Sequence, residues 1–241
     1  MNSAIKLLRV LGSPFVPEKT ISIDQTEKEE LFECSIKNRM LFYFLDKIGR
    51  KNLGELTPLY YKEYEKYERT YDAITGTSRI LSEANIKHGV IKTIRPYRST
   101  TVDIDIVTFG PKSEYEKAIL ILLEANYGML GRGPQSTTMQ HPTVDIKVDI
   151  YNEVAVSNII YLNKQKLADF KIIRKLQNDQ TVEMLAPEAD LVTLIAHSII
   201  KEHMYTLAEY CTFVNYLKQI NKDKFLQLAI ESNVAIPIKT H

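Results

Sequence analysis

Hydrophobic and polar residues alternate with a period of two in several stretches of the chain, which is typical of β-strands. Val102–Thr108 is one of these stretches, and Ile86–Thr93 before it is also expected to be a strand. A basic turn rich in hydroxyl groups, residues 94–101, joins the two. The most regular alternation covers Ser136–Tyr151, where the valines and isoleucines are expected to face inward. A shorter extended piece follows at Thr181–Leu185. Together these stretches predict one small β-sheet.

Elsewhere the apolar positions recur every three to four residues, which is the spacing of amphipathic helices. Gly49 is expected to end the first helix, and Ser113 to cap the one that begins near Lys112. Gly128–Pro134 is expected to be a mobile loop or a hairpin turn, and Thr20–Ile23 a short extended piece. The sequence predicts helices from Asp24 or Thr26 to about Ile48, and at Leu59–Asn85, Lys112–Tyr127, Leu162–Leu176, Ala189–Lys201, His203–Ile220 and Lys222–Ser232.

Four tyrosines, Tyr60, Tyr64, Tyr67 and Tyr71, fall on one face of the second of these helices. They could form an aromatic platform for a base or a sugar. The alternative is a helix face packed on its neighbour, with the hydroxyl groups at the rim, and this is the interpretation we favour.

The order of strands and helices indicates an α/β (α+β) protein, with a small mixed sheet, helices packed behind it and a C-terminal helical bundle. We expect an N-terminal helical extension at residues 1–58, an α/β core at 59–160 and a C-terminal helical domain at 161–241.

Composition narrows the class of protein. The chain of 241 residues is 44% hydrophobic and 25% charged, which is typical of soluble globular proteins. A net charge of +1 argues against extended binding to nucleic acid, so any basic site must be local. We expect Cys34 and Cys211 to be free thiols, and the absence of a signal peptide or a membrane-spanning stretch predicts a cytoplasmic protein without membrane contact. The sequence does not indicate an oligomeric state.

The candidate chemistry lies in the second predicted strand, where Asp103 and Asp105 stand two residues apart and therefore share a face. Two carboxylates this close repel each other unless a positive group lies between them. Hard oxygen ligands of this kind suit Mg²⁺. Asp145 and Asp149 share a polar face on the later strand, and either could add a third carboxylate. The alternative for the pair is a strand end exposed to water or paired with arginines of the turn.

Three elements of the chain, in this order, resemble the nucleotidyltransferase superfamily typified by DNA polymerase beta, and in particular its small prokaryotic and archaeal members with a C-terminal helical domain. The elements are Val90-Ile91-Lys92-Thr93, Val102-Asp103-Ile104-Asp105-Ile106 and Val148-Asp149-Ile150-Tyr151. The stretch Leu185–Glu188 and the helix with His197 are also similar to the helical half of that group. The resemblance covers roughly residues 60–220.

The resemblance implies a metal-dependent enzyme that moves a nucleoside monophosphate from an NTP, such as ATP, to an acceptor hydroxyl. It implies that Asp103 and Asp105 bind two Mg²⁺ ions, with Mn²⁺ as the alternative, and that Asp149 binds only the catalytic ion and can accept the acceptor's proton. The nucleotide-binding residues implied are Lys92, Thr93, Arg95, Arg98, Ser99 and Thr100. The acceptor is a small molecule, a protein or an RNA end.

One departure from the superfamily's pattern supports a different class of function. The phosphate-binding turn of these enzymes carries Gly followed by Gly or Ser, whereas this chain has Lys92-Thr93. Glycine allows the backbone to approach a phosphate closely, and threonine does not. The rival hypothesis is therefore a nucleotide-binding or interaction protein of the same fold with weak or no catalytic activity.

His197, in the helix expected at Ala189–Lys201, is interpreted as a packed histidine with one satisfied ring nitrogen.

Overall fold

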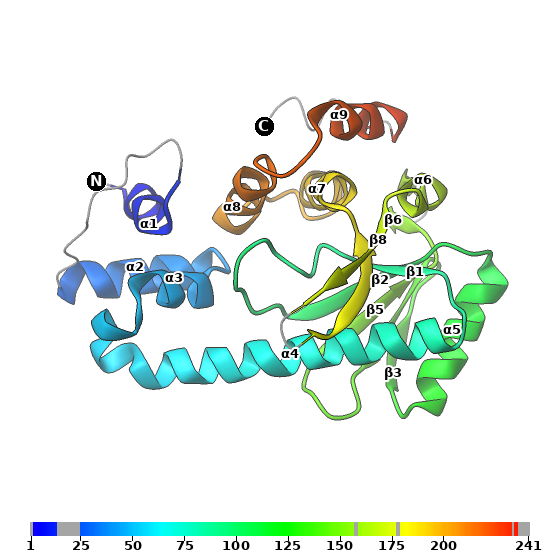
Figure 1. The fold of residues 1–241 in the computed structure, drawn as a ribbon, viewed down its shortest axis with the longest axis horizontal. Helices are drawn as coiled ribbons and strands as arrows, with labels where there is room; N and C mark the ends of the chain where they lie inside the picture. The colour runs from blue at the N-terminus through cyan, green and yellow to red at the C-terminus, as the bar shows by residue number, and fades with distance from the viewer. Residues whose placement is uncertain (1, 14–24, 157–158, 177–178, 233, 236–241) are drawn as a thin grey trace. The chain divides into compact units, whose positions relative to one another are not determined.

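The structure, a computed structural model, describes residues 2–13, 25–156, 159–176, 179–232 and 234–235, so the predicted extended piece at Thr20–Ile23 lies outside the described residues. The chain forms two compact units (Figure 1). Unit 1 consists of Met1–Glu68, Arg95–Thr100 and Tyr205–Lys218, and unit 2 of Arg69–Ile94, Thr101–Met204 and Gln219–His241. The predicted division into three parts stays a prediction.

Unit 2 is built on a mixed sheet of seven strands among the described residues, in the order β3-β4-β5-β2-β1-β9-β8. The pairs β2–β5 and β1–β9 are parallel and the other neighbours are antiparallel. This arrangement confirms the predicted fold class. The strands are β1 (His88–Ile91), β2 (Asp103–Thr108), β3 (Gly128–Arg132), β4 (Ser136–Gln140), β5 (Lys147–Tyr151), β8 (Lys171–Lys175) and β9 (Thr181–Leu185), and a separate two-stranded sheet contains β6 (Val154–Val156) and β7 (Ile159–Leu162).

The helices of unit 2 cover the two faces of the seven-stranded sheet (Figure 1). One face packs against α5 and the part of α4 that belongs to unit 2, and α7 lies on the other face. Because side chains alternate along a strand, Asp103 and Asp105, which alternate with the buried Ile104 and Ile106, point away from α4 and α5. The helices are α4 (Thr57–Glu83), α5 (Lys112–Glu124), α6 (Lys164–Ala168), α7 (Pro187–Ala196), the π-helical turn η4 (His197–Lys201) and α9 (Lys222–Glu231).

Unit 1 is helical, and the first three tyrosines of the predicted stripe pack around Phe42 in it. The Phe42 ring lies 5.9 Å from that of Tyr60 and 5.3 Å from that of Tyr67, and both tyrosines are buried. Tyr71 packs against the core of unit 2. The stripe is therefore a packing face. The elements of unit 1 are α1 (Ser3–Leu11), α2 (Gln25–Lys37), α3 (Leu41–Ile48), the 3₁₀ turns η1 (Arg50–Asn52) and η2 (Gly54–Leu56), the first part of α4, and α8 (Leu207–Tyr216).

The prediction of one continuous first helix up to Ile48 was wrong, because the chain breaks between α2 and α3. Arg39 has a left-handed backbone, with φ of +57°. The Arg39 N–H donates to the carbonyl of Ile36 at 3.0 Å, and the Met40 N–H donates to that of Ser35 at 2.8 Å. This is the Schellman pattern of a helix end. The apolar stripe continues in phase across the break, which is why periodicity did not reveal it. The predicted end at Gly49 is confirmed.

The prediction of one strand over Ser136–Tyr151 was also wrong. The segment forms two antiparallel strands, β4 and β5, in which Thr138 lies opposite Asp149. Between them the chain turns near Pro142, whose ring nitrogen has no proton to donate to a strand partner. Asp145 is exposed in this turn, whereas Asp149 lies on β5.

Four more predictions need correction. Leu162–Leu176 is not a helix but the end of β7, the short α6 and the edge strand β8, because residues 171–175 pair with β9. Helix α8 begins at Leu207 rather than His203, since Thr206 caps it and His203 has φ of +51°. Ser113 lies inside α5, which follows Pro111 without a side-chain cap. The glycine-rich segment from Gly128 is mostly strand β3, followed by a hairpin tip.

Two observations bear on the expected compartment. Cys34 and Cys211 are both free thiols, as predicted. In the described part of the chain, no helix combines the length and the apolar character needed to cross a membrane. The compartment itself stays a prediction.

Two glycines should respond in opposite ways to alanine. A Cβ at Gly89 would lie 3.1 Å from two ring carbons of Phe109, whereas a Cβ at Gly76, in the middle of α4, meets nothing within 4 Å. We expect Gly89→Ala to lower the free energy of unfolding by about 1–3 kcal/mol through overpacking. Gly76→Ala should raise it by about 0.5–1 kcal/mol through higher helix propensity. Urea unfolding measures both, and an unaffected Gly89→Ala would contradict the close packing.

Candidate active site

Three aspartates share one face of two neighbouring strands in unit 2. Asp103 and Asp105 lie two residues apart on β2, so their side chains point the same way. In the parallel pairing of β2 with β5, Asp149 lies directly opposite Asp105. The residues Ile104 and Val148 are fully buried on the other face. The fold therefore brings together the three carboxylates that the sequence nominated, and we call them the acid cluster.

Asp105 is the most enclosed member of the acid cluster, with only 8% of its surface exposed. The Tyr151 hydroxyl donates to Asp105 Oδ1 at 2.9 Å, and Lys92 Nζ lies 3.4 Å from Asp105 Oδ2. The carboxylate of Asp149 accepts a hydrogen bond from the Thr138 hydroxyl on β4. Tyr151 shares the polar face of Asp149, as the alternation predicts, but it is buried rather than exposed.

Burial and mutual repulsion disfavour the ionised form of the aspartates in the acid cluster. Burial and, next, repulsion from Asp105 raise the pKa of Asp103 to about 6, against an opposing effect of Lys92. Burial also raises the pKa of Asp149, although the hydrogen bond from Thr138 opposes this shift. Lys201 on η4 favours the charged form of both aspartates. Carboxylates whose protonation is favoured in this way stabilise an added cation.

The residue with a glycine-like backbone at the end of β1 is Lys92, not Thr93. Lys92 has φ of +56°, in the left-handed region that glycine adopts most readily. Its N–H donates to Asp190 Oδ1 at 2.6 Å, and Asp190 lies buried in the first turn of α7. The helix side of unit 2 therefore holds this turn in place through one buried carboxylate.

Thr93 connects β1 to β2 through its side chain. The Thr93 hydroxyl donates to the carbonyl of Ile91 at 3.0 Å and accepts the N–H of Asp105 at 2.9 Å. The hydroxyl thus positions the backbone of Asp105 within unit 2. A role of Thr93 in binding phosphate stays a prediction.

His197, the first residue of η4, contacts Lys92, which pairs with Asp105 of the acid cluster. Its Nδ1 lies 3.1 Å from Lys92 Nζ and 3.3 Å from the Tyr161 hydroxyl. Because an ammonium group can only donate, Nδ1 is the acceptor, and a neutral ring carries its proton on Nε2, which lies 3.3 Å from Glu202 Oε1. The interpretation of His197 as a simply packed histidine therefore misses its contact with Lys92.

Sequence reasoning did not identify Tyr161, Asp190, His197 and Lys201 as neighbours of the acid cluster. The π-helical turn that carries His197 and Lys201 has no signature in hydrophobic periodicity. For Tyr161 and Asp190 the sequence contains no pairing signal, since both meet their partners only through tertiary packing.

No protein-family model matches this chain, and no curated protein matches it. Among solved structures, the solution structure of the antibiotic-resistance factor ANT(2'')-Ia matches with a TM-score of 0.51 and 12% sequence identity, over 73% of this chain and 98% of that one. The chain has a nucleotidyltransferase fold. This confirms, at the level of fold, the resemblance of its three sequence elements to that superfamily.

Two further matches to the nucleotidyltransferase fold are weaker. A crystal structure of ANT(2'')-Ia in complex with adenylyl-2''-tobramycin has a TM-score of 0.46 and 10% identity, over 65% of this chain and 92% of that one. The lincomycin-bound lincosamide antibiotic adenylyltransferase LnuA has a TM-score of 0.39 and 16% identity, over 59% of this chain and 92% of that one.

The other predicted nucleotide-binding residues belong to unit 1. Arg95 pairs with Glu209 Oε1 at 3.2 Å and donates to Thr212. The guanidinium of Arg98 lies 3.3 Å from a carboxylate oxygen of Asp46. The Thr100 hydroxyl donates to Glu63 at 3.0 Å, and Ser99 is half-buried. These contacts hold the segment 95–100 within unit 1, and its role in nucleotide binding stays a prediction.

The acid cluster fits a divalent cation by the chemistry of its donors. It offers oxygen ligands from three carboxylates on paired strands, and repulsion from Asp105 adds to burial in raising the pKa of Asp103. Among the described residues, however, no group of three His, Cys, Asp or Glu side chains is arranged to hold a metal ion. The Asp105 carboxylate is instead held by Lys92 and Tyr151.

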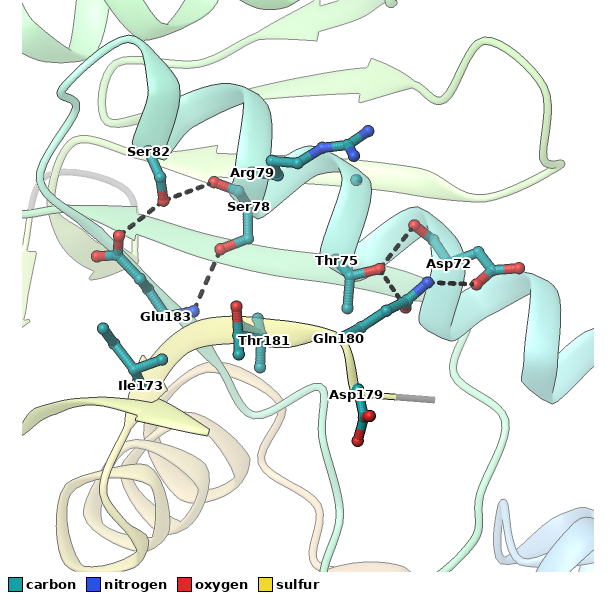
Figure 2. A pocket seen from close by; sticks show the side chains of 12 residues that line it. Asp72, Thr75, Ser78, Arg79, Ser82, Ile173, Asp179, Gln180, Thr181 and Glu183 are labelled. Atoms are coloured by element: carbon teal, nitrogen blue, oxygen red, sulfur yellow. Dashed lines mark hydrogen bonds between the residues drawn. The ribbon is translucent and has the colours of Figure 1, made fainter. Parts of the chain in front are cut away.

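A separate hollow of about 640 Å³ opens between α4 and the strands β8 and β9 (Figure 2). Its polar groups largely satisfy one another: Thr75 donates to Gln180 at 2.8 Å, and Ser82 donates to Glu183 at 2.7 Å. None of the acid cluster lines this hollow. Side chains that are already paired offer little to a ligand, so the acid cluster is the better candidate for catalysis.

Proposed function

We propose that this chain is a divalent-metal-dependent nucleotidyltransferase, which moves a nucleoside monophosphate from an NTP to an acceptor hydroxyl and releases pyrophosphate. The observation that carries the proposal is the register of β2 with β5, which sets Asp149 opposite Asp105 and on the same face as Asp103. This arrangement is built into a nucleotidyltransferase fold. We expect the protein to act in the cytoplasm, where NTPs are abundant.

The proposed roles follow from the positions of the side chains. Asp103 and Asp105 would hold two Mg²⁺ ions, or Mn²⁺, and Asp149 would hold the catalytic ion alone. The bound ions would neutralise charge on the phosphates and favour ionisation of the acceptor. Asp149, at the end of the cluster beside β4, would accept the proton of the acceptor hydroxyl. Tyr151 and Thr138 would orient the carboxylates.

The ammonium of Lys92 is the nearest proposed counter-charge for the NTP phosphates, and Lys201 on η4 adds a second cation on the same side of the sheet. Arg95, Arg98, Ser99 and Thr100 are proposed as further phosphate ligands. To serve as one, Arg95 would have to exchange Glu209 for phosphate.

A second candidate function is a nucleotide-binding or interaction protein without transfer activity. The observation that favours it is the Lys92 side chain, which occupies the acid cluster from a backbone position that suits glycine. A nucleotide-binding protein of this kind would share the nucleotide site of the proposed enzyme and would differ from it only in turnover.

Two measurements on the wild-type chain separate these functions. Calorimetry with the magnesium complexes of ATP, CTP, GTP and UTP should show binding of at least one nucleotide. Pyrophosphate release should then appear in the presence of an acceptor, tested with cell extract, RNA, protein and small hydroxyl compounds such as tobramycin and lincomycin. Release that requires both nucleotide and acceptor is the expected result. Binding without release across all acceptors would favour the second candidate.

A further inference from the structure

Lys92 occupies the position at which a cation would contact the acid cluster. Its side chain is largely buried, and its Nζ lies 3.4 Å from Asp105 Oδ2 and 5.5 Å from the centre of the Tyr151 ring. We infer that the Lys92 ammonium is a built-in counter-ion of the acid cluster, and that a divalent cation binds only by displacing it from Asp105. This inference rests on the proposed metal-dependent function of the same site.

The arrangement of ligands supports displacement rather than coexistence. Asp105 lies at the centre of the acid cluster, next to Asp103 on its own strand and opposite Asp149 on β5. One of its carboxylate oxygens accepts from Tyr151 and the other faces Lys92. A metal ion bound to that second oxygen would compete with the ammonium for it. Two cations on one carboxylate oxygen repel each other strongly in a site so poorly exposed to water.

The His197 ring offers an acceptor for the displaced Lys92 ammonium. Lys92 Nζ already lies 3.1 Å from His197 Nδ1, which must act as an acceptor towards it. The Lys92 backbone is held separately, by the bond from its N–H to Asp190. The ammonium can therefore leave Asp105 by rotation of its side chain while the turn stays in place. His197 acts as a positioning residue that keeps Lys92 beside the site.

This displacement would order the binding of metal and nucleotide. While the ammonium neutralises Asp105, it is unavailable to a phosphate. With Asp105 committed to a bound cation, Lys92 would be free to approach the NTP. One lysine would then serve first the carboxylate and afterwards the substrate. The free protein should bind a metal ion more weakly than the three carboxylates alone would allow.

The test measures Mn²⁺ binding without nucleotide, by electron paramagnetic resonance of free Mn²⁺. Lys92→Met removes the charge but keeps most of the bulk of the side chain. Lys92→Gly removes the charge and suits the left-handed backbone, so it guards against misfolding of the first variant. We expect both to bind Mn²⁺ at least about tenfold more tightly than wild type, because the competing charge is gone. The control Lys87→Met removes an exposed lysine just before β1 and should match wild type.

Lys92→Arg sharpens the comparison, because it keeps the charge and should bind Mn²⁺ within about threefold of wild type. Unchanged or weaker binding by the folded Lys92→Gly protein would overturn the inference, and so would the absence of Mn²⁺ binding in every variant. Tighter Mn²⁺ binding without pyrophosphate release by wild type would reject the proposed function alone. Release by wild type with unchanged Mn²⁺ binding in the variants would reject the inference alone.

Discussion

The double variant Asp103→Asn with Asp105→Asn should release pyrophosphate at least about a thousandfold more slowly than wild type. Asparagine keeps the size of the side chain and one carbonyl oxygen, so the Tyr151 hydroxyl retains an acceptor at position 105. The change removes two negative charges from the acid cluster, and with them the ligands for both proposed metal ions. Pyrophosphate release and calorimetry of MgNTP binding, with circular dichroism to confirm folding, measure the effect.

The chain offers a matched control for the third carboxylate. Asp149→Asn changes the residue opposite Asp105 on β5, whereas Asp145→Asn makes the same chemical change in the exposed turn before that strand. We expect a large loss of release from Asp149→Asn and a rate within about twofold of wild type from Asp145→Asn. Full activity of the double variant at positions 103 and 105 would refute the proposed catalytic role of the acid cluster.

Asp103→Asn alone should make the metal-free protein more stable at pH 7.5, by about 1–3 kcal/mol. In the folded protein the pKa of Asp103 is raised to about 6, by burial and by repulsion from Asp105. The unfolded chain releases this proton at the lower, ordinary pKa of an aspartate. The contribution of Asp103 to stability is therefore fully present below pH 4 and is lost as the pH rises through 6. The amide side chain of the Asp103→Asn variant stays uncharged at every pH, so this variant does not lose this stability as the pH rises.

The free energies of unfolding of Asp103→Asn and wild type at two pH values test whether the raised pKa of Asp103 causes this stabilisation. Urea unfolding in a chelating buffer at pH 5 and pH 7.5 gives the free energy of unfolding of both proteins. The advantage of Asp103→Asn over wild type should be larger at pH 7.5 than at pH 5. The groups that face Asp103 are Asp105, Lys92, Asp149 and Lys201, and all of them are present in both proteins. An equal or lower stability of Asp103→Asn at pH 7.5, with Asp145→Asn as control, would contradict the raised pKa.

These two predictions describe a conflict between function and stability in one cluster. The same carboxylates that are proposed to bind metal repel one another in the free protein. Lys92 relieves part of this repulsion at Asp105. Replacing Lys92 should therefore raise the affinity for a cation, whereas replacing Asp103 should lower it.

Local patterns were sufficient where a feature depends on neighbours in the sequence. The alternation around Asp103 and Asp105 was correctly interpreted as a strand because the side-chain period of a strand is a local property. The tyrosine-rich helix α4 and strand β9 were also predicted from local patterns. Local patterns failed at Arg39, where the chain turns without disturbing the apolar period. They also failed at Pro142, where the buried positions change from Thr137 and Met139 to Ile146 and Val148. They failed again at β8, an edge strand whose two isoleucines, Ile172 and Ile173, are adjacent and therefore do not alternate with polar residues.

The sequence by itself determined the strand with two aspartates, the later strand with Asp149 and their resemblance to one superfamily, since each of these depends on short motifs. The tertiary structure decided what surrounds those carboxylates. The register of β2 with β5 set Asp149 rather than Asp145 opposite Asp105. The packing of α7 and η4 on the sheet brought Asp190 and His197 to Lys92 from about a hundred residues away. Such contacts follow from the closure of the whole fold, and no local spacing encodes them.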